Sequence, residues 1–202
     1  MSLQEIQACS LVVAAGGRWR DGTQAEFLNA IRDGTLPQEA FQRWLVQDYY
    51  FVKGLTTFVA ITIAKTPRPS QKILIAGLVA LDAELDWFEQ HAQQQSLDLT
   101  TAMHPICKRY VDYLVASAYT QPFEVLLAML YGVEASYTSG WSALDAAGPY
   151  AEFIHRWSNE LFVDYVGELL KTCNRHPHHS RQTQFNEVLR HECNFWRMTW
   201  EG

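Results

Sequence analysis

Apolar side chains recur along this chain at the spacing of an α-helix, and this periodicity constrains the fold more than any other feature. Phe41, Trp44, Leu45, Val52 and Leu55 lie on one helical face. Similar stripes follow in later segments, and proline or glycine separates each segment from the next. An alternating strand pattern of useful length does not occur. The sequence therefore predicts an all-α, bundle-like protein.

Breaks in the pattern set the expected helices. Gly34 suits a left-handed helix end, and Thr35 with Gln38 fits a capping box before the next helix. Polar, glycine-containing sequence around Gly16–Gly22 precedes the first clear helix. The predicted helices span about 25–31, 41–64, 70–94, from 105 onward, 122–144, 150–170, and a last segment from after Ser180 to 200. At this length we expect one domain over residues 1–202, without repeats or linkers.

Composition excludes several classes of protein. The formal net charge is -6 with both signs mixed along the chain, which gives no electrostatic reason to expect a nucleic acid or an anionic membrane as partner. Charged residues interrupt the apolar windows before bilayer length, and no basic leader precedes the short apolar run at 11–15. The four cysteines are scattered, without a CxxC pair. We expect free thiols and a cytoplasmic protein.

Three of the apolar faces each contain one acidic residue. Asp48 lies in the Phe41 stripe, Glu134 lies in the stripe of the predicted 122–144 helix, and Glu192 lies in the stripe of the last helix. A buried, unpaired carboxylate costs several kcal/mol. If the three converge in one cavity, desolvation and mutual repulsion raise at least one pKa into the range of a general acid. The other interpretation is that each acid is structural and ties helices together.

Nearby aromatic residues suit a flat heteroaromatic ligand, although aromatics at helical spacing are commonly core residues. They are Tyr49, Phe51, Tyr110, Tyr137, Trp157 and Trp196. Metal sites are the weaker alternative. Glu187 with His191, and Glu84 with His91, have one-face spacing. Di-iron bundles need a Glu-x-x-His motif on each of two helices, and this sequence contains only one, Glu152-x-x-His155. We therefore expect no metal and no cofactor.

These residues carry a resemblance to a known family. The run Phe41-x-x-Trp44-Leu45-x-Gln47-Asp48-Tyr49-x-Phe51 resembles the signature of the TenA/thiaminase II family, which has the heme-oxygenase-like helical fold. The likeness covers nearly the whole chain. Corresponding motifs are Pro105 with Tyr110, Glu134 to Tyr137, Phe153-Ile154-x-x-Trp157-Ser158-x-Glu160-x-Phe162, and Glu192-x-x-Phe195-Trp196-x-Met198.

The resemblance implies a role in thiamine salvage. That family cleaves thiamine, or hydrolyses 4-amino-5-(aminomethyl)-2-methylpyrimidine to the hydroxymethylpyrimidine, and its members are homo-oligomers, which implies a dimer or tetramer here. By motif, Asp48 would bind the aminopyrimidine edge and Glu192 would handle protons at the ring. Tyr110 and Tyr137 would support the site. Phe51 would form a wall, and Trp157 stands where the family usually has a tyrosine.

One position departs from the family pattern. Members with a catalytic cysteine have Pro-Cys four residues before the tyrosine equivalent to Tyr137, and here those positions read Gly132-Val133, followed by Glu134. The chain is similar to the cysteine-less branch, so hydrolysis of the aminomethylpyrimidine or its N-formyl derivative is expected rather than plain thiaminase activity. Two rivals remain. One is a non-catalytic binder of small aromatics, and the other is a metal-dependent oxidase on the same fold.

Overall fold

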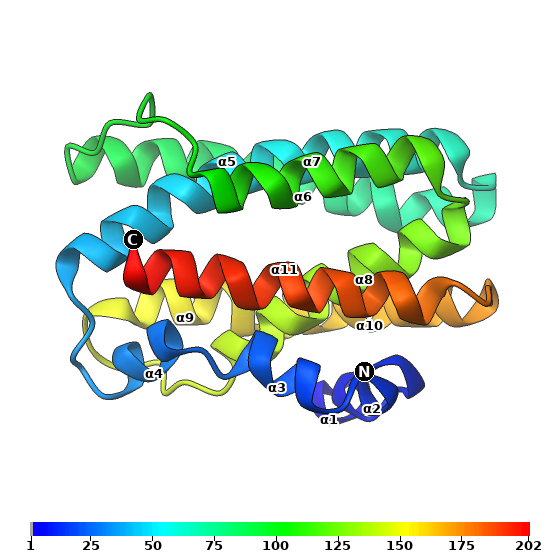
Figure 1. The fold of residues 1–202 in the computed structure, drawn as a ribbon, viewed down its shortest axis with the longest axis horizontal. Coiled ribbons are helices and arrows are strands. Elements are labelled where there is room, and N and C mark those ends of the chain that lie inside the picture. Colours follow the sequence, from blue (N-terminus) through cyan, green and yellow to red (C-terminus); the bar gives the residue numbers. More distant parts are fainter. Residues whose placement is uncertain (1) are drawn as a thin grey trace. The chain divides into compact units, whose positions relative to one another are not determined.

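The computed structural model describes residues 2–202, and every regular element in that part of the chain is a helix (Figure 1). This confirms the all-α prediction. The contacts divide the chain into two compact units, each built from two separate stretches of sequence. Unit 1 comprises Met1–Leu36 and Glu124–Arg197, and unit 2 comprises Pro37–Phe123 and Met198–Gly202. The expectation of one domain over residues 1–202 stays a prediction.

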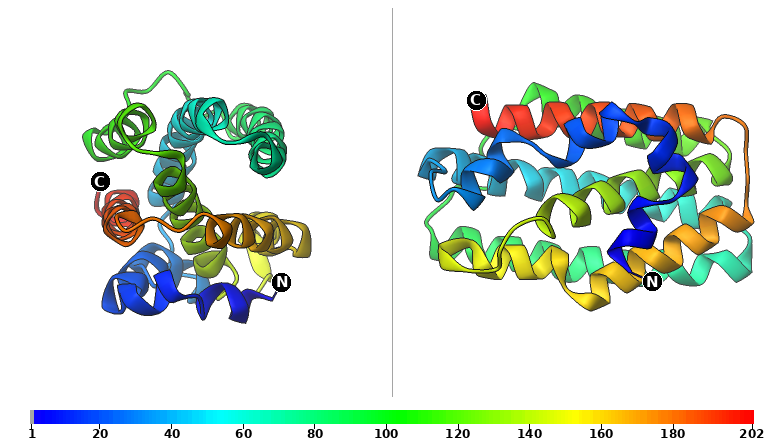
Figure 2. Two further views of the ribbon diagram at one scale, coloured as in Figure 1. Left: turned by 90° about the vertical axis from the view of Figure 1, so that its right-hand side faces the viewer. Right: turned by 90° about the horizontal axis from the view of Figure 1, so that it is seen from below.

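Unit 2 consists mainly of three long helices. They are α5 (Gln38–Lys65), α6 (Arg68–Gln94) and α7 (Pro105–Thr120). Helix α5 packs against both of the others, which run beside it in Figures 1 and 2. A glycine permits one of these contacts: a Cβ added at Gly54 would lie 2.5 Å from Cγ1 of Val111. Helices α5 and α7 therefore approach more closely there than any side chain at residue 54 would allow.

Unit 1 is organised around a buried helix. Its helices are α1 (Leu3–Gln7), α2 (Ser10–Ala15), α3 (Gly17–Thr23), α4 (Glu26–Arg32), α8 (Phe123–Trp141), a 3₁₀ turn η1 (Gly148–Tyr150), α9 (Ala151–Ser158), α10 (Glu160–Arg175) and most of α11 (Arg181–Glu201). Every residue from 125 to 141 on α8 is buried. The apolar stripe predicted a helix with one buried face, whereas α8 is buried on all sides, as is typical of a helix in a protein core.

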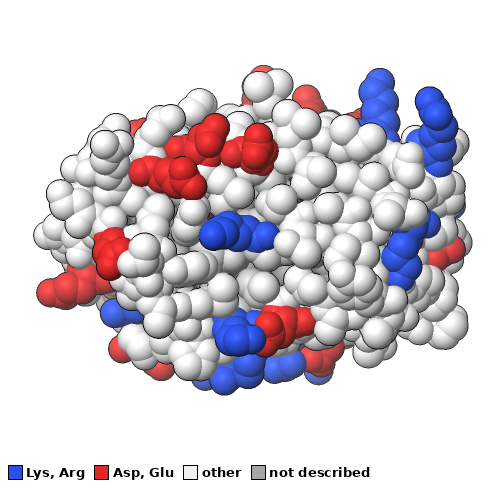
Figure 3. All heavy atoms as spheres, turned by 90° about the horizontal axis from the view of Figure 1, so that it is seen from above, with Lys and Arg blue, Asp and Glu red and all other residues white. Residues whose placement is uncertain are grey.

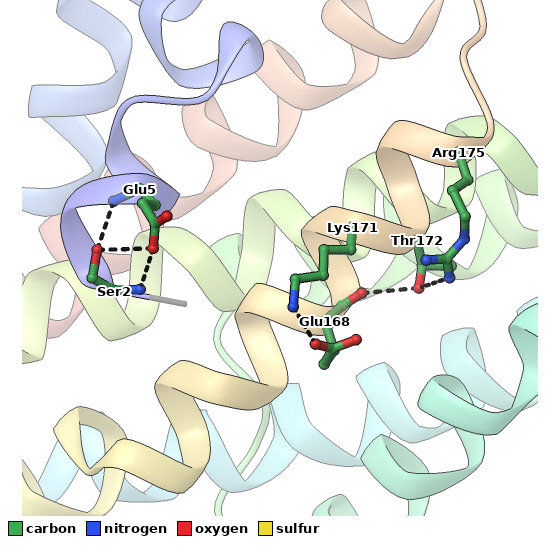
Figure 4. Close-up of polar contacts among 6 residues, drawn as sticks. All are labelled: Ser2, Glu5, Glu168, Lys171, Thr172 and Arg175. Atoms are coloured by element: carbon green, nitrogen blue, oxygen red, sulfur yellow. Dashed lines mark hydrogen bonds and ion pairs between the residues drawn. The ribbon is translucent and has the colours of Figure 1, made fainter.

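Three short helices at the start of the chain were not predicted. Helix α3 occupies the polar, glycine-containing stretch around Gly16–Gly22, and α1 and α2 precede it. A capping box begins α1, in which the Glu5 backbone N–H donates to Oγ of Ser2 at 3.3 Å and the Ser2 N–H donates to Oε2 of Glu5 at 2.7 Å (Figure 4). The Tyr131 hydroxyl then donates to the Ile6 carbonyl at 2.8 Å and ties α1 to α8.

The predicted helix over 150–170 is divided in two. Asn159 adopts an extended conformation, with ψ of 160°, between α9 and α10. Its side chain accepts a hydrogen bond from the Phe162 N–H at 3.0 Å, so Asn159 is the N-cap of α10. Farther along α10, the exposed Glu168–Lys171 pair at 2.6 Å and the Arg175–Thr172 hydrogen bond at 2.9 Å lie one turn apart (Figure 4).

The break before α5 was predicted in part. Gly34 has a φ of +66°, as expected for a left-handed helix end, and the Thr35 N–H donates to the Ala30 carbonyl at 2.8 Å. The Thr35–Gln38 capping box was wrong, because Pro37 occupies the N-cap position and α5 begins at Gln38. Proline has a fixed φ that suits this position, so no hydroxyl is needed there.

Charged side chains of both signs share the protein surface. On the face in Figure 3, acidic and basic residues both occur, some of them side by side, and broad uncharged areas lie between the groups. Within residues 2–202, no helix combines the length and the apolar character needed to cross a bilayer.

Candidate functional site

Asp48 lies in the interior of unit 2, where 2% of its surface is exposed. Its neighbour on α7 is Cys107, whose thiol donates to the Gln47 carbonyl at 3.4 Å. Burial and, to a lesser extent, the nearby charge of Asp48 raise the pKa of Cys107 to about 12. Asp48 therefore lies on the side of α5 that meets α7, as its place in the apolar stripe predicted.

Gln47 fixes the start of α7 beside this acid. Its Oε1 accepts from the His104 N–H at 2.7 Å, and its Nε2 donates to the Ala102 carbonyl at 3.4 Å. Because Gln47 precedes Asp48, the same turn of α5 carries the acid and positions the neighbouring helix. The sequence run contained this glutamine, but nothing in its pattern indicated the contact.

Phe51 on α5 and Tyr110 on α7 lie one turn beyond Asp48 and Cys107, where the same two helices meet. Their ring centroids lie 4.8 Å apart, and both side chains are buried. The predicted wall residue and the predicted supporting tyrosine are thus in contact. Tyr49 points elsewhere, because its hydroxyl donates to Glu89 on α6 at 2.9 Å. Unit 2 therefore groups Asp48, Phe51 and Tyr110.

In unit 1, Glu134 and Glu192 lie at the same level of two packed helices. Before them, a Cβ at Gly132 of α8 would lie 3.1 Å from Val188 of α11. After them, the rings of Tyr137 and Trp196 stack at 5.5 Å. Each acid lies between these two contacts on its own helix. Both are buried, with 7% and 2% of their surfaces exposed.

An aromatic group follows the two acids. The ring of Tyr137 stacks on Trp196 with an interplanar angle of 13° and meets Trp157 edge-on at 5.3 Å. The Thr138 hydroxyl donates to the Trp157 carbonyl at 2.7 Å, which attaches α9 to α8. Glu134 and Glu192 therefore lie one turn from three packed aromatic rings, as their helical spacing predicted.

Tyr165 is a neighbour of Glu134 that the sequence did not indicate. Burial raises the pKa of its hydroxyl well above the ordinary value, and the charge of Glu134 raises it further. Tyr165 lies on the amphipathic helix α10. From the sequence alone, a tyrosine on such a helix cannot be told from an ordinary packing residue. Only the packing of α10 near Glu134 reveals the proximity.

The predicted acids thus fall into two groups. Asp48 belongs to unit 2, whereas Glu134 and Glu192 belong to unit 1. Their convergence in a single cavity stays a prediction.

The alternative metal pair at the end of the chain has other partners. Glu187 accepts from Arg190 at 2.7 Å, and the two form an exposed ion pair. A cluster of three or more His, Cys, Asp or Glu side chains suited to a metal ion does not occur within residues 2–202.

The four cysteines are free thiols. Burial raises the pKa of Cys173 to about 11 and that of Cys107 to about 12, and it also raises the pKa of Cys193. A thiol with such a pKa carries its proton at neutral pH and is a poor nucleophile.

The TENA/THI-4/PQQC family profile matches residues 18–202, and the chain belongs to this family. The Glycine max protein named "Probable bifunctional TENA-E protein" is 25% identical over 200 residues, covering 90% of this chain and 87% of that protein.

Solved structures share the fold along nearly the full chain. A TenA homologue from Pyrococcus furiosus has a TM-score of 0.88 and 29% identity, covering 98% of this chain and 100% of its own. A protein from Sulfolobus solfataricus described as a putative TenA-like thiaminase has a TM-score of 0.82 and 20% identity, covering 94% of this chain and 93% of its own. At that identity, the second likeness shows the fold alone.

Proposed function

We propose that this chain hydrolyses aminopyrimidine fragments of thiamine by carboxylate acid–base catalysis, without a nucleophilic cysteine. The substrate would be 4-amino-5-(aminomethyl)-2-methylpyrimidine or its N-formyl derivative. The observation that carries the proposal is the pair of buried acids, Glu134 and Glu192, at one level of α8 and α11 beside stacked aromatic rings. Membership of the TENA/THI-4/PQQC family supports the reaction class.

Each acid has a distinct role in this proposal. Asp48 accepts a hydrogen bond from the exocyclic amine of the pyrimidine, and Phe51 with Tyr110 packs against the substrate. Glu192 exchanges a proton with a ring nitrogen. Glu134 is the base for water, because Val133 stands at the position of the family's cysteine. Two neighbouring buried carboxylates do not both ionise readily, so one holds a proton while the other accepts one.

The reaction consumes one water molecule. For the protonated aminomethyl substrate, the water oxygen bonds to the exocyclic methylene carbon as the carbon–nitrogen bond breaks. Ammonia leaves with the bonding electron pair, and Glu134 takes the proton from water. That proton then passes to the released ammonia, giving ammonium and the hydroxymethylpyrimidine and restoring the carboxylate.

Ammonia release tests the proposal directly. We expect the purified protein to release one equivalent of ammonia per substrate. The variants Asp48→Asn and Glu192→Gln should each lower kcat/KM by about 100-fold or more, within the range for acid–base groups. Both replacements conserve shape, so circular dichroism should show a helical fold. Near-normal turnover in either variant would show that its assigned role is wrong.

Glu134→Gln separates the base from a structural acid. We expect the wild-type rate to follow a bell-shaped profile between about pH 5 and 9, with the acid limb lost in the variant. A variant that keeps the profile and only melts at a lower temperature would assign Glu134 to packing. Binding of the aminopyrimidine without ammonia release from the wild type would instead support the non-catalytic binder.

A further inference from the structure

Tyr165 holds a buried hydroxyl that the protein itself does not satisfy. Its oxygen is shielded from solvent and has no hydrogen-bond partner within residues 2–202. A buried hydroxyl without a partner destabilises the folded state, so native proteins usually give such a group a partner. The partner here must come from outside the described chain, as a water molecule or a ligand.

The neighbour of this hydroxyl is the proposed base. Glu134 is close enough for its charge to raise the Tyr165 pKa, yet the two side chains form no direct hydrogen bond. The raised pKa keeps the phenol protonated at neutral pH, so Tyr165 acts there as a hydrogen-bond donor. Glu134, when ionised, is an acceptor. Tyr165 on α10 is thus a donor and Glu134 on α8 is an acceptor in its vicinity.

A water molecule is the smallest species that can accept a hydrogen bond from the Tyr165 phenol and donate one to the Glu134 carboxylate. Its oxygen accepts from the phenol while one of its hydrogens points to the carboxylate, and its second lone pair remains available. The helices that carry the two side chains are fixed locally. Thr138 attaches α8 to the Trp157 carbonyl, and Asn159 caps α10 just after Trp157.

We propose that the Tyr165 hydroxyl holds the hydrolytic water against Glu134 and is a positioning residue for the reaction. This inference rests on the proposed hydrolysis. In the reacting complex the phenol donates to the water oxygen, and the water gives its proton to Glu134 as its oxygen bonds to the methylene carbon. Tyr165 keeps its own proton throughout.

Tyr165→Phe tests the role, because it removes only the hydroxyl. We expect kcat for ammonia release to fall by about 10-fold or more, within the range for groups that assist proton transfer. KM should stay within about twofold, because the substrate loses no contact. Loss of a donor near the carboxylate should also move the acid limb of the kcat profile to higher pH by about half a unit or more.

Tyr131→Phe is a matched control in the same unit. Its hydroxyl is also buried, but it donates to the Ile6 carbonyl at 2.8 Å. This variant should melt at a lower temperature and keep kcat. Tyr165→Phe should lower the melting temperature less than Tyr131→Phe does, because it breaks no hydrogen bond to another residue.

The outcomes separate this inference from the proposed function. A wild-type protein that releases no ammonia refutes the hydrolysis and the inference together. With an active wild type, an unchanged kcat in Tyr165→Phe would show a structural tyrosine. A raised KM with kcat retained would show that Tyr165 contacts substrate rather than water. Either result overturns the positioning role.

Discussion

Gly54→Ala is the variant that most directly tests how the helix packing supports the site. The added Cβ would lie 2.5 Å from Cγ1 and 2.7 Å from Cγ2 of Val111, whereas ordinary contacts are 3.4–4 Å. Relief of this overlap requires α5 and α7 to separate by about 1 Å. Phe51 and Tyr110, whose rings meet at 4.8 Å one turn away, would move apart with their helices.

Two opposing effects set the expected change in stability. Overpacking in a well-packed core costs about 1–3 kcal/mol. Replacing a helical glycine by alanine gains about 1 kcal/mol in intrinsic helix propensity. The clash is severe and involves a short, stiff side chain, so we expect a net loss of about 1–2 kcal/mol. For a chain of this length, that corresponds to a melting temperature lower by about 2–8 °C.

Thermal melts and substrate titrations measure the two consequences. Gly54→Ala should melt at a lower temperature. It should also raise KM, because Phe51 and Tyr110, which we propose pack against the substrate, would move apart. Gly17→Ala is the control, since its added Cβ meets nothing within 4 Å. Adding Val111→Ala to Gly54→Ala removes both clashing methyl groups and should recover stability. A Gly54→Ala variant as stable as the control would refute the tight α5–α7 contact.

Further predictions concern the cysteines, Thr138 and Asn159. Alkylation by iodoacetamide at pH 7 should leave the rate of ammonia release unchanged, because Cys107 and Cys173 are buried and protonated; inactivation through one cysteine would end the cysteine-free mechanism. The pKa of the Cys107 thiol is 9.0 in the unfolded chain and about 12 in the folded one. The unfolded chain therefore loses this proton first, and the free energy of unfolding should fall as the pH rises from one pKa to the other. Urea melts should show that Cys107→Ala removes about 1.4 kcal/mol per pH unit of this slope, and an unchanged slope would contradict the assignment. Thr138→Val removes the hydroxyl that donates to the Trp157 carbonyl and should lower the free energy of unfolding by about 1–3 kcal/mol. Asn159→Ala removes the N-cap of α10 and should lower the free energy of unfolding by about 1 kcal/mol. Wild-type stability in either variant would count against the corresponding contact.

Much of the fold follows from local sequence signals. Pro67, Pro105 and Gly34 mark helix ends because their backbone preferences act without help from distant contacts. The missed helices α1 to α3 span five to seven residues each. Helices this short are unstable alone and form through packing, which leaves little pattern in the sequence. The break at Asn159 was missed because the surrounding apolar spacing continues through it.

The candidate site was predictable only where one helix carries the information. Burial of Asp48, Glu134 and Glu192 followed from their stripes, although Glu134 is buried because all of α8 is interior. The Asp48 neighbour Cys107 and the Glu134 neighbour Tyr165 depend on which helices meet, and periodicity does not record this. The cysteine-less assignment, the substrate and the oligomeric state stay predictions.

The order of synthesis gives the end of α11 a particular importance. Unit 2 includes Met198–Gly202, which the ribosome adds long after Pro37–Phe123, the other stretch of that unit. Arg43, near the start of α5, donates to the carbonyls of Met198, Thr199 and Trp200 at 3.0–3.2 Å. The nascent chain therefore contains Arg43 long before its acceptors exist, and unit 2 cannot complete its contacts until residues 198–202 have been added. A chain cut before Met198 would leave Arg43 without these three carbonyl acceptors.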